Sequence, residues 1–97
     1  MVRITIHDGE KHVTLKIEGR AAEPWIAEIN RAWQNLAPSL GPRKLSVDLR
    51  GITFMDAAGR HVLAEIHDGT GAEFLADTPM TKYFAEEAMR GIRTNSR

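Results

Sequence analysis

The sequence contains no cysteine, no long hydrophobic run and no excess of charge of either sign. Without thiols the chain has neither a disulfide scaffold nor a thiolate nucleophile, and such a composition is typical of a reducing compartment. The 13 Lys and Arg residues balance the 13 Asp and Glu residues, so no basic field attracts nucleic acid or anionic lipid. No segment resembles a signal peptide or reaches the ~18 apolar residues of a membrane span. We therefore expect a cytoplasmic protein without nucleic-acid binding or direct membrane insertion.

Length and composition indicate one ordinary globular domain. The chain has 97 residues, of which 42% are hydrophobic and 27% charged, and this excludes disordered, collagen-like and coiled-coil classes. A chain of this size buries about 60–65% of its unfolded surface, which is enough for a modest core. We predict a single domain over residues 1–97, with a polar tail from about residue 92.

Two alternating segments open the sequence and predict a β-hairpin. Apolar and polar residues alternate over residues 4–6 and again over residues 13–17, with the period of a half-buried strand. A four-residue loop at Asp8–Lys11 would pair His7 with His12 and place the apolar side chains on one face of the sheet. The apolar positions are Ile4, Ile6, Val13, Leu15 and Ile17. Gly19 would end the second strand, and the polar face, which carries Thr5, Thr14 and Lys16, would be open or covered by a second copy of the chain.

Three later segments have helical periodicity. The first starts at Pro24 and stops near Pro38, and the second is capped by Asp56 and ends at Gly69. The third follows Thr78-Pro79, a cap and a first-turn proline. Their apolar stripes contain Trp25, Ile29, Ala32, Trp33 and Leu36, then Ala58, Val62, Leu63 and Ile66, then Met80, Phe84, Ala88 and Ile92.

Two further strands separate these helices. One is predicted at Leu45–Leu49, followed by a short extended stretch over residues 52–55, and the other at Ala72–Ala76. The element order is β-β-α-β-α-β-α, which is typical of an α/β domain with a mixed sheet. Because the strands alternate rather than run continuously apolar, we expect the helices mainly on one face.

The segment Val47–Gly59 combines a strand, the turn glycine Gly51, an aromatic residue, the capping Asp56 and small residues that open a helix. With the preceding hairpin and the whole element order, it resembles the STAS family of sulfate-transporter and anti-sigma-factor-antagonist domains. The resemblance runs from about Ile4 to about Gly91. It implies the STAS fold, including its strand order, and a protein-binding role without catalysis.

The antagonist branch of that family carries a Ser or Thr just after this aspartate, which a partner kinase phosphorylates. Phosphate would add about −1.5 to −2 charge at the start of the helix that docks the partner. The matching positions here are Ala57 and Ala58, which have no hydroxyl to accept a phosphoryl group. The sequence therefore predicts that this phosphorylation switch is absent. Arg60 and His61 follow where small or apolar residues are common in the family.

The candidate partner-binding residues form one turn: Asp56, Ala57, Ala58, Gly59, Arg60 and His61. Several of them also have a purely structural interpretation. Asp56 is a good helix cap, alanine favours helix and close packing, and Arg60 and His61 suit a solvated first turn. The resemblance adds a docking surface on which Arg60 and His61 would provide specificity.

The sequence offers no set of residues for metal binding or catalysis. His61 and Glu65 share a helix face, and His7 and His12 could meet across the hairpin, but two ligands do not make a closed zinc site. No nucleophile elbow and no glycine-rich phosphate loop is present. We expect no metal, no cofactor and no enzyme activity.

Two functions remain open. By resemblance, the chain would be an antagonist that binds an anti-sigma factor or its kinase, and so frees a sigma factor for transcription. The alternative is an accessory STAS subunit that docks on the ATPase of an ABC-type membrane transporter. A neutral, unphosphorylatable helix start fits both partners.

Overall fold

The computed structural model describes residues 1–90, and the expected Ile92 and the polar tail lie outside the described residues. The elements follow the predicted order. They are β1 (Val2–Asp8), β2 (His12–Ala21), α1 (Ile26–Leu36), a 3₁₀ turn (Ala37–Ser39), β3 (Lys44–Met55), α2 (Ala57–Thr70), β4 (Glu73–Leu75) and α3 (Pro79–Arg90).

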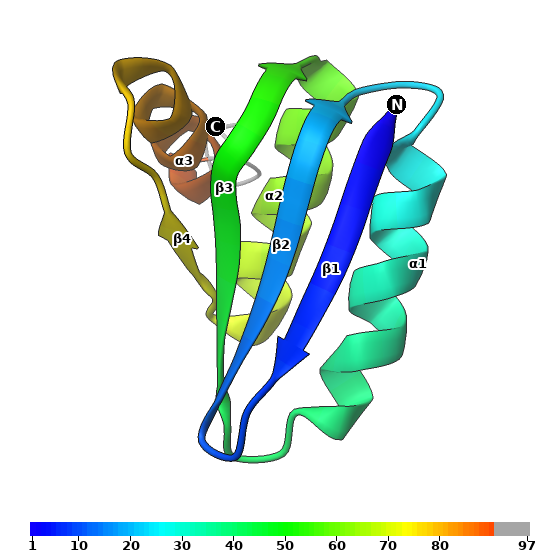
Figure 1. Cartoon of the computed structure of the whole chain (residues 1–97), viewed down its shortest axis with the longest axis vertical. Coiled ribbons are helices and arrows are strands. Elements are labelled where there is room, and N and C mark those ends of the chain that lie inside the picture. The colour runs from blue at the N-terminus through cyan, green and yellow to red at the C-terminus, as the bar shows by residue number, and fades with distance from the viewer. Residues whose placement is uncertain (91–97) are drawn as a thin grey trace.

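The four strands form one mixed sheet in the order β1-β2-β3-β4. β1 and β2 are antiparallel, whereas the β2–β3 and β3–β4 pairs are parallel. In Figure 1 the sheet lies in front of α2, with α1 and α3 flanking it, so the opposite face of the sheet is open. The α/β class, the mixed sheet and the helices on one face are thus confirmed.

The core lies between the sheet and the helices. Val13, Leu15 and Ile17 of β2 are fully buried, as the alternation predicted. They pack in one cluster with the apolar stripes of α1 and α2. Trp25 and Trp33 are half-buried against this cluster, which confirms the packing interpretation of both residues.

The hairpin forms, but its predicted register is wrong by two residues. His7 pairs with Thr14 rather than His12, and Ile4 pairs with Ile17. The turn closes one residue later than expected because the Gly9 N–H donates to the His12 carbonyl at 3.0 Å. A shift of two keeps every side chain on its predicted face. The suggested meeting of His7 and His12 does not occur.

Several boundaries also differ from expectation. β2 continues past Gly19 to Ala21, because Gly19 adopts a φ of 91° within the strand. β3 is one strand of 12 residues rather than a strand and a separate extended stretch. It pairs with β2 along its length through two register irregularities. β4 is only three residues long.

The helices depart from the sequence-based expectation in three places. α1 begins after Pro24, which lies in a turn closed by the Trp25 N–H and the Ala22 carbonyl at 2.8 Å. α2 runs past Gly69 to Thr70 and ends on Gly71, whose φ is 71°. The predicted stripe of α3 is confirmed in part: Ala88 is buried and Phe84 is half-buried against the core, whereas Met80 is 44% exposed. Small residues supply most of the buried face, which lets α3 lie close to its neighbours. The buried residues of α3 are Thr81, Ala85 and Ala88.

Candidate functional site

The candidate site is the turn from β3 into α2, at the end of the sheet where the parallel strands β2 and β3 both finish (Figure 1). Asp56 caps α2: its Oδ1 accepts a hydrogen bond from the Gly59 N–H at 2.8 Å. This confirms the capping role predicted for Asp56, and it leaves the first turn of α2 with defined geometry.

The same carboxylate also connects α2 to the loop that follows β2. Asp56 Oδ2 accepts from the Glu23 N–H at 3.1 Å, and the Asp56 N–H donates to the Ala21 carbonyl at 3.4 Å. Partial burial raises the pKa of the Asp56 carboxyl, but the backbone N–H groups of Gly59 and Glu23 outweigh it, so the pKa lies below its usual value. Asp56 is therefore ionised at neutral pH and joins two loops.

Gly59 is buried where the first turn of α2 meets the end of β2. A Cβ at this position would lie 1.8 Å from the Ala21 carbonyl oxygen and 2.9 Å from Met55 Cγ. Only glycine permits this approach, since the nearest atom belongs to the backbone. Of the six candidate residues, Gly59 thus acts on the shape of the site and offers no side chain to a partner.

The two alanines occupy different environments. Ala57 is exposed, whereas Ala58 is half-buried and packs against the core. Neither carries a hydroxyl, so the start of α2 presents a methyl surface beside the N–H groups of its first turn.

Arg60 and His61 lie on the exposed side of the same turn. Arg60 Nη1 lies 3.5 Å from Glu87 Oε1 of α3, and His61 Nε2 lies 3.3 Å from Glu65 Oε2. Glu87 is only 19% exposed and also pairs with Arg90 at 3.1 Å. The ion pair of Arg60 therefore joins the candidate site to α3.

Sequence analysis did not identify Glu23 or Glu87 as neighbours of this turn. Glu23 contributes a backbone N–H, which carries no residue-specific signal. Glu87 is 27 positions from Arg60 in the sequence, and only the packing of α3 on α2 brings the two side chains together. No local pattern encodes either contact.

The remaining histidines lie apart from the site. His12 Nε2 is 2.6 Å from Ser46 Oγ, and His67 Nδ1 is 2.7 Å from the Ala72 carbonyl. Within residues 1–90 there is no cluster of three or more His, Cys, Asp or Glu side chains that could hold a metal ion.

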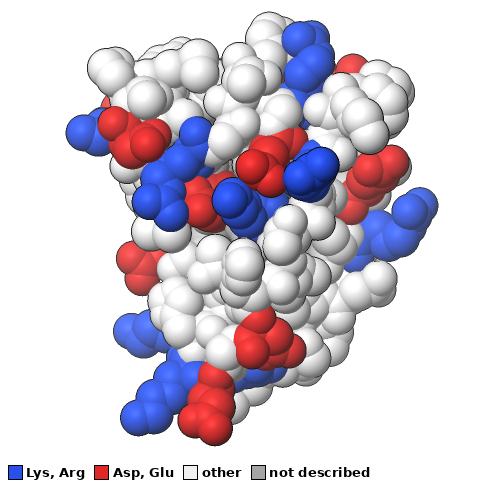
Figure 2. Space-filling model, in the orientation of Figure 1, with Lys and Arg blue, Asp and Glu red and all other residues white. Residues whose placement is uncertain are grey.

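The open face of the sheet carries charged side chains of both signs, which Figure 2 shows as an interspersed belt. Within it, Asp48 is 5% exposed and accepts two hydrogen bonds from the Arg50 guanidinium, both at 3.0 Å. These bonds, opposed by burial, hold the pKa of the Asp48 carboxyl below its usual value. Lys16 Nζ lies 3.9 Å from Glu18 Oε2 on the same face.

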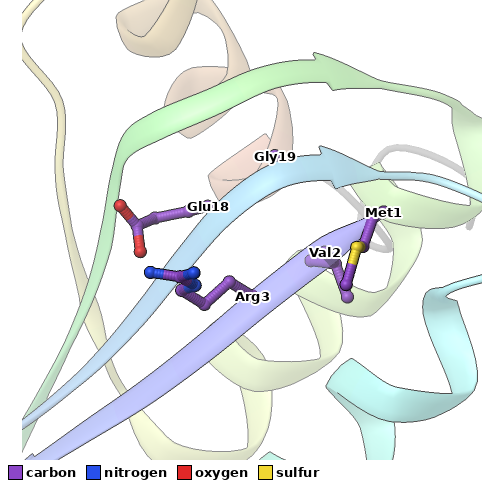
Figure 3. Close-up of a pocket in the computed structure, with 5 residues that line it drawn as sticks. All are labelled: Met1, Val2, Arg3, Glu18 and Gly19. Atoms are coloured by element: carbon purple, nitrogen blue, oxygen red, sulfur yellow. The ribbon is translucent and has the colours of Figure 1, made fainter.

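A shallow pocket lies beside the N-terminal end of β1. It is lined by Met1, Val2, Arg3, Glu18 and Gly19. Figure 3 shows the side chains of Arg3 and Glu18 pointing toward one another across it. The pocket contains none of the six candidate residues.

Comparison with known proteins identifies the fold. No family model matches the sequence, and no curated protein matches it. Among solved structures, an anti-sigma factor antagonist from Mycobacterium paratuberculosis aligns with a TM-score of 0.76 at 18% identity, over 86% of this chain and 74% of that one. The anti-sigma factor antagonist SpoIIAA, in its unphosphorylated form, aligns with a TM-score of 0.60 at 10% identity, over 87% and 82% of the two chains.

A third structure, Mglu, aligns with a TM-score of 0.61 at 19% identity, but the match spans only 19% of that longer chain. All three identities are low, so these likenesses define the fold alone. The chain has the STAS-like fold of the anti-sigma factor antagonists, as the sequence resemblance implied. Separately, none of the helices described over residues 1–90 is long and apolar enough to cross a membrane.

Proposed function

We propose that this chain is a non-catalytic protein-interaction module that acts as an anti-sigma factor antagonist and binds its partner through the turn Asp56–His61. The partner is an anti-sigma factor, or the kinase that serves as one. The observation that carries the proposal is the likeness of the fold to two anti-sigma factor antagonists, combined with an exposed first turn of α2.

The geometry of the turn supports a role in recognition. Asp56, Ala21 and Gly59 hold the start of α2 against the sheet, so Ala57, Arg60 and His61 are presented on a rigid element. A surface that is already ordered loses little conformational entropy on binding. Alanine at both positions after Asp56 leaves the surface without a phosphoacceptor, so the binding state does not respond to a kinase.

A negative charge introduced at the start of α2 tests whether this turn binds the partner. Ala58→Glu places a carboxylate where a phosphorylated relative would carry phosphate, and Ala58→Gln adds a side chain of nearly the same size without charge. A tagged chain is used to capture proteins from its host lysate, and the captured proteins are identified by mass spectrometry. We expect wild type and Ala58→Gln to recover an anti-sigma factor and Ala58→Glu to lose it.

Other outcomes give different conclusions. Recovery of a transporter ATPase instead would replace the antagonist proposal with the accessory-subunit alternative. Recovery of this chain alone, together with a dimeric mass by light scattering, would point to self-association across the open sheet face. Equal capture by all three variants would overturn the assignment of the docking surface to the start of α2.

A further inference from the structure

Three of the large apolar side chains exposed in the described chain lie on one short helix. Met80, Tyr83 and Met89 of α3 are 44%, 56% and 48% exposed. Buried Thr81, Ala85 and Ala88 define the opposite side of the helix. At 100° per residue, Met80 and Tyr83 lie on one flank of α3 with half-buried Phe84, and Met89 lies on the other flank.

The flank with Met80 and Tyr83 is the one that faces the candidate site. Glu87 lies four residues after Tyr83 and seven after Met80, which places all three on one helical stripe. Glu87 in turn contacts Arg60 of the first α2 turn. The apolar stripe of α3 is therefore continuous with the Asp56–His61 turn.

Two arginines meet one glutamate at the junction of the two surfaces. Arg60 and Arg90 both contact Glu87, at 3.5 Å and 3.1 Å, and they retain 48% and 60% side-chain exposure. Two guanidinium groups share the one carboxylate of Glu87 beside the apolar stripe, and neither is fully paired by it. A guanidinium that is half exposed can still accept a second carboxylate in its fork geometry.

We propose that the stripe Met80–Tyr83–Phe84, with Arg60 and Arg90 at its end, forms the second half of the partner-docking surface. It binds an amphipathic helix of the protein partner that presents apolar side chains and one Asp or Glu. This inference rests on the proposed function, because it extends the same docking surface. An apolar contact area with an aromatic residue and arginine at its edge is the composition of interface hot spots.

Photo-crosslinking and binding measurements test the stripe. A benzoylphenylalanine is placed at residue 83, or at residue 89 as the control on the opposite flank of the same helix. The partner of interest is the protein that wild type recovers and Ala58→Glu does not. We expect this protein to crosslink to a probe at residue 83 and not to a probe at residue 89. The crosslinked partner segment should contain an apolar stripe with an acidic residue, and it is then synthesised as a peptide.

The affinity of each variant for that peptide measures how much Tyr83, Met89 and Arg60 contribute to binding. We expect Tyr83→Ser to weaken binding at least about tenfold, and Met89→Ser to change it by less than twofold. Replacing the acidic residue of the peptide by its amide should weaken binding to wild type but not to Arg60→Ala. Circular dichroism melts of each variant verify that the fold is retained.

The two levels of the proposal can fail separately. An Ala58→Glu-sensitive partner that crosslinks equally from both flanks, or binds Tyr83→Ser as well as wild type, would overturn the α3 surface and leave the proposed function standing. A partner that needs Tyr83 but tolerates Ala58→Glu would support the α3 surface and contradict the role of the α2 turn. Recovery of no partner by any variant would refute both.

Discussion

The contact between Gly59 and Ala21 predicts that Gly59→Ala severely destabilises the protein. The added Cβ would lie 1.8 Å from the Ala21 carbonyl oxygen, whereas ordinary contact begins at 3.4 Å. The backbone of β2 cannot rotate away as a flexible side chain could, so the start of α2 must shift outward. The helix and the strand would then separate at the point where the site is built.

The expected magnitude has two parts. Overpacking of this kind costs about 1–3 kcal/mol. An outward shift also lengthens the hydrogen bonds from Asp56 N to Ala21 O and from Glu23 N to Asp56 Oδ2, each of which contributes about 1 kcal/mol. Together these terms give a loss of about 3 kcal/mol or more in the free energy of unfolding, a large share of the ~5–15 kcal/mol typical of a domain.

Gly69→Ala is the matched control on the same helix. A Cβ at Gly69 would lie 3.6 Å and 3.7 Å from two ring carbons of Trp33, which is ordinary van der Waals contact. Alanine is favoured over glycine in a helix by about 1 kcal/mol, less near its end. We therefore expect Gly69→Ala to be neutral or slightly stabilising.

Urea unfolding and thermal melts, both followed by circular dichroism, measure the free energy of unfolding and the melting temperature of each variant. We expect Gly59→Ala to lower the melting temperature by about 12–24 °C, since 1 kcal/mol corresponds to about 4–8 °C in a domain of this size. A Gly59→Ala variant within about 1 kcal/mol of wild type would show that α2 and β2 do not approach as closely as the structure describes.

Two further predictions concern the carboxylates with lowered pKa. Asp56→Ala removes the α2 cap and should lower stability by about 0.5–2 kcal/mol at pH 7. Because the pKa of Asp56 is below its unfolded value, the difference from wild type should shrink as acid titration protonates the carboxyl below about pH 4; a constant difference would refute the capping contribution. Arg50→Ala leaves buried Asp48 without its guanidinium partner, and we expect a modest loss of stability, because the backbone N–H of residue 50 still donates to Asp48 Oδ1. That loss should diminish in denaturant titrations as the pH falls through the lowered pKa of the Asp48 carboxyl, because protonation removes the charge that Arg50 pairs.

Local rules predicted most of the fold and one key contact of the site. The alternation in β2 determined its buried face, and Asp56 followed by small residues located the start of α2. These are short-range effects, because strand period and helix capping depend on residues within a few positions. For the same reason, the hairpin register was off by two: both registers bury the same side chains, and only the Gly9–His12 turn distinguishes them.

Contacts between distant segments could not be predicted in this way. The buried face of α3 depends on how closely its small residues approach their neighbours, whereas hydrophobic periodicity also favours the larger Met80, which is exposed. The pairing of Arg60 with Glu87 then follows from that packing. A hydrophobicity pattern marks which side chains are apolar, but it does not distinguish a close helix contact from an exposed stripe.

Because the start of α2 is rigid, a charge introduced at residue 58 tests how this turn recognises its partner. Three features hold Asp56–His61 in place: the Asp56 cap, the bond from Glu23 to the same carboxylate and the close approach of Gly59 to Ala21. A turn held in this way has little freedom to change shape when residue 58 is altered. An Ala58→Glu variant that loses its partner while Ala58→Gln retains it would therefore report repulsion or desolvation of a carboxylate rather than rearrangement of the turn. If both variants lost the partner equally, the half-buried methyl of Ala58 would itself be the contact, and recognition at this turn would depend on shape.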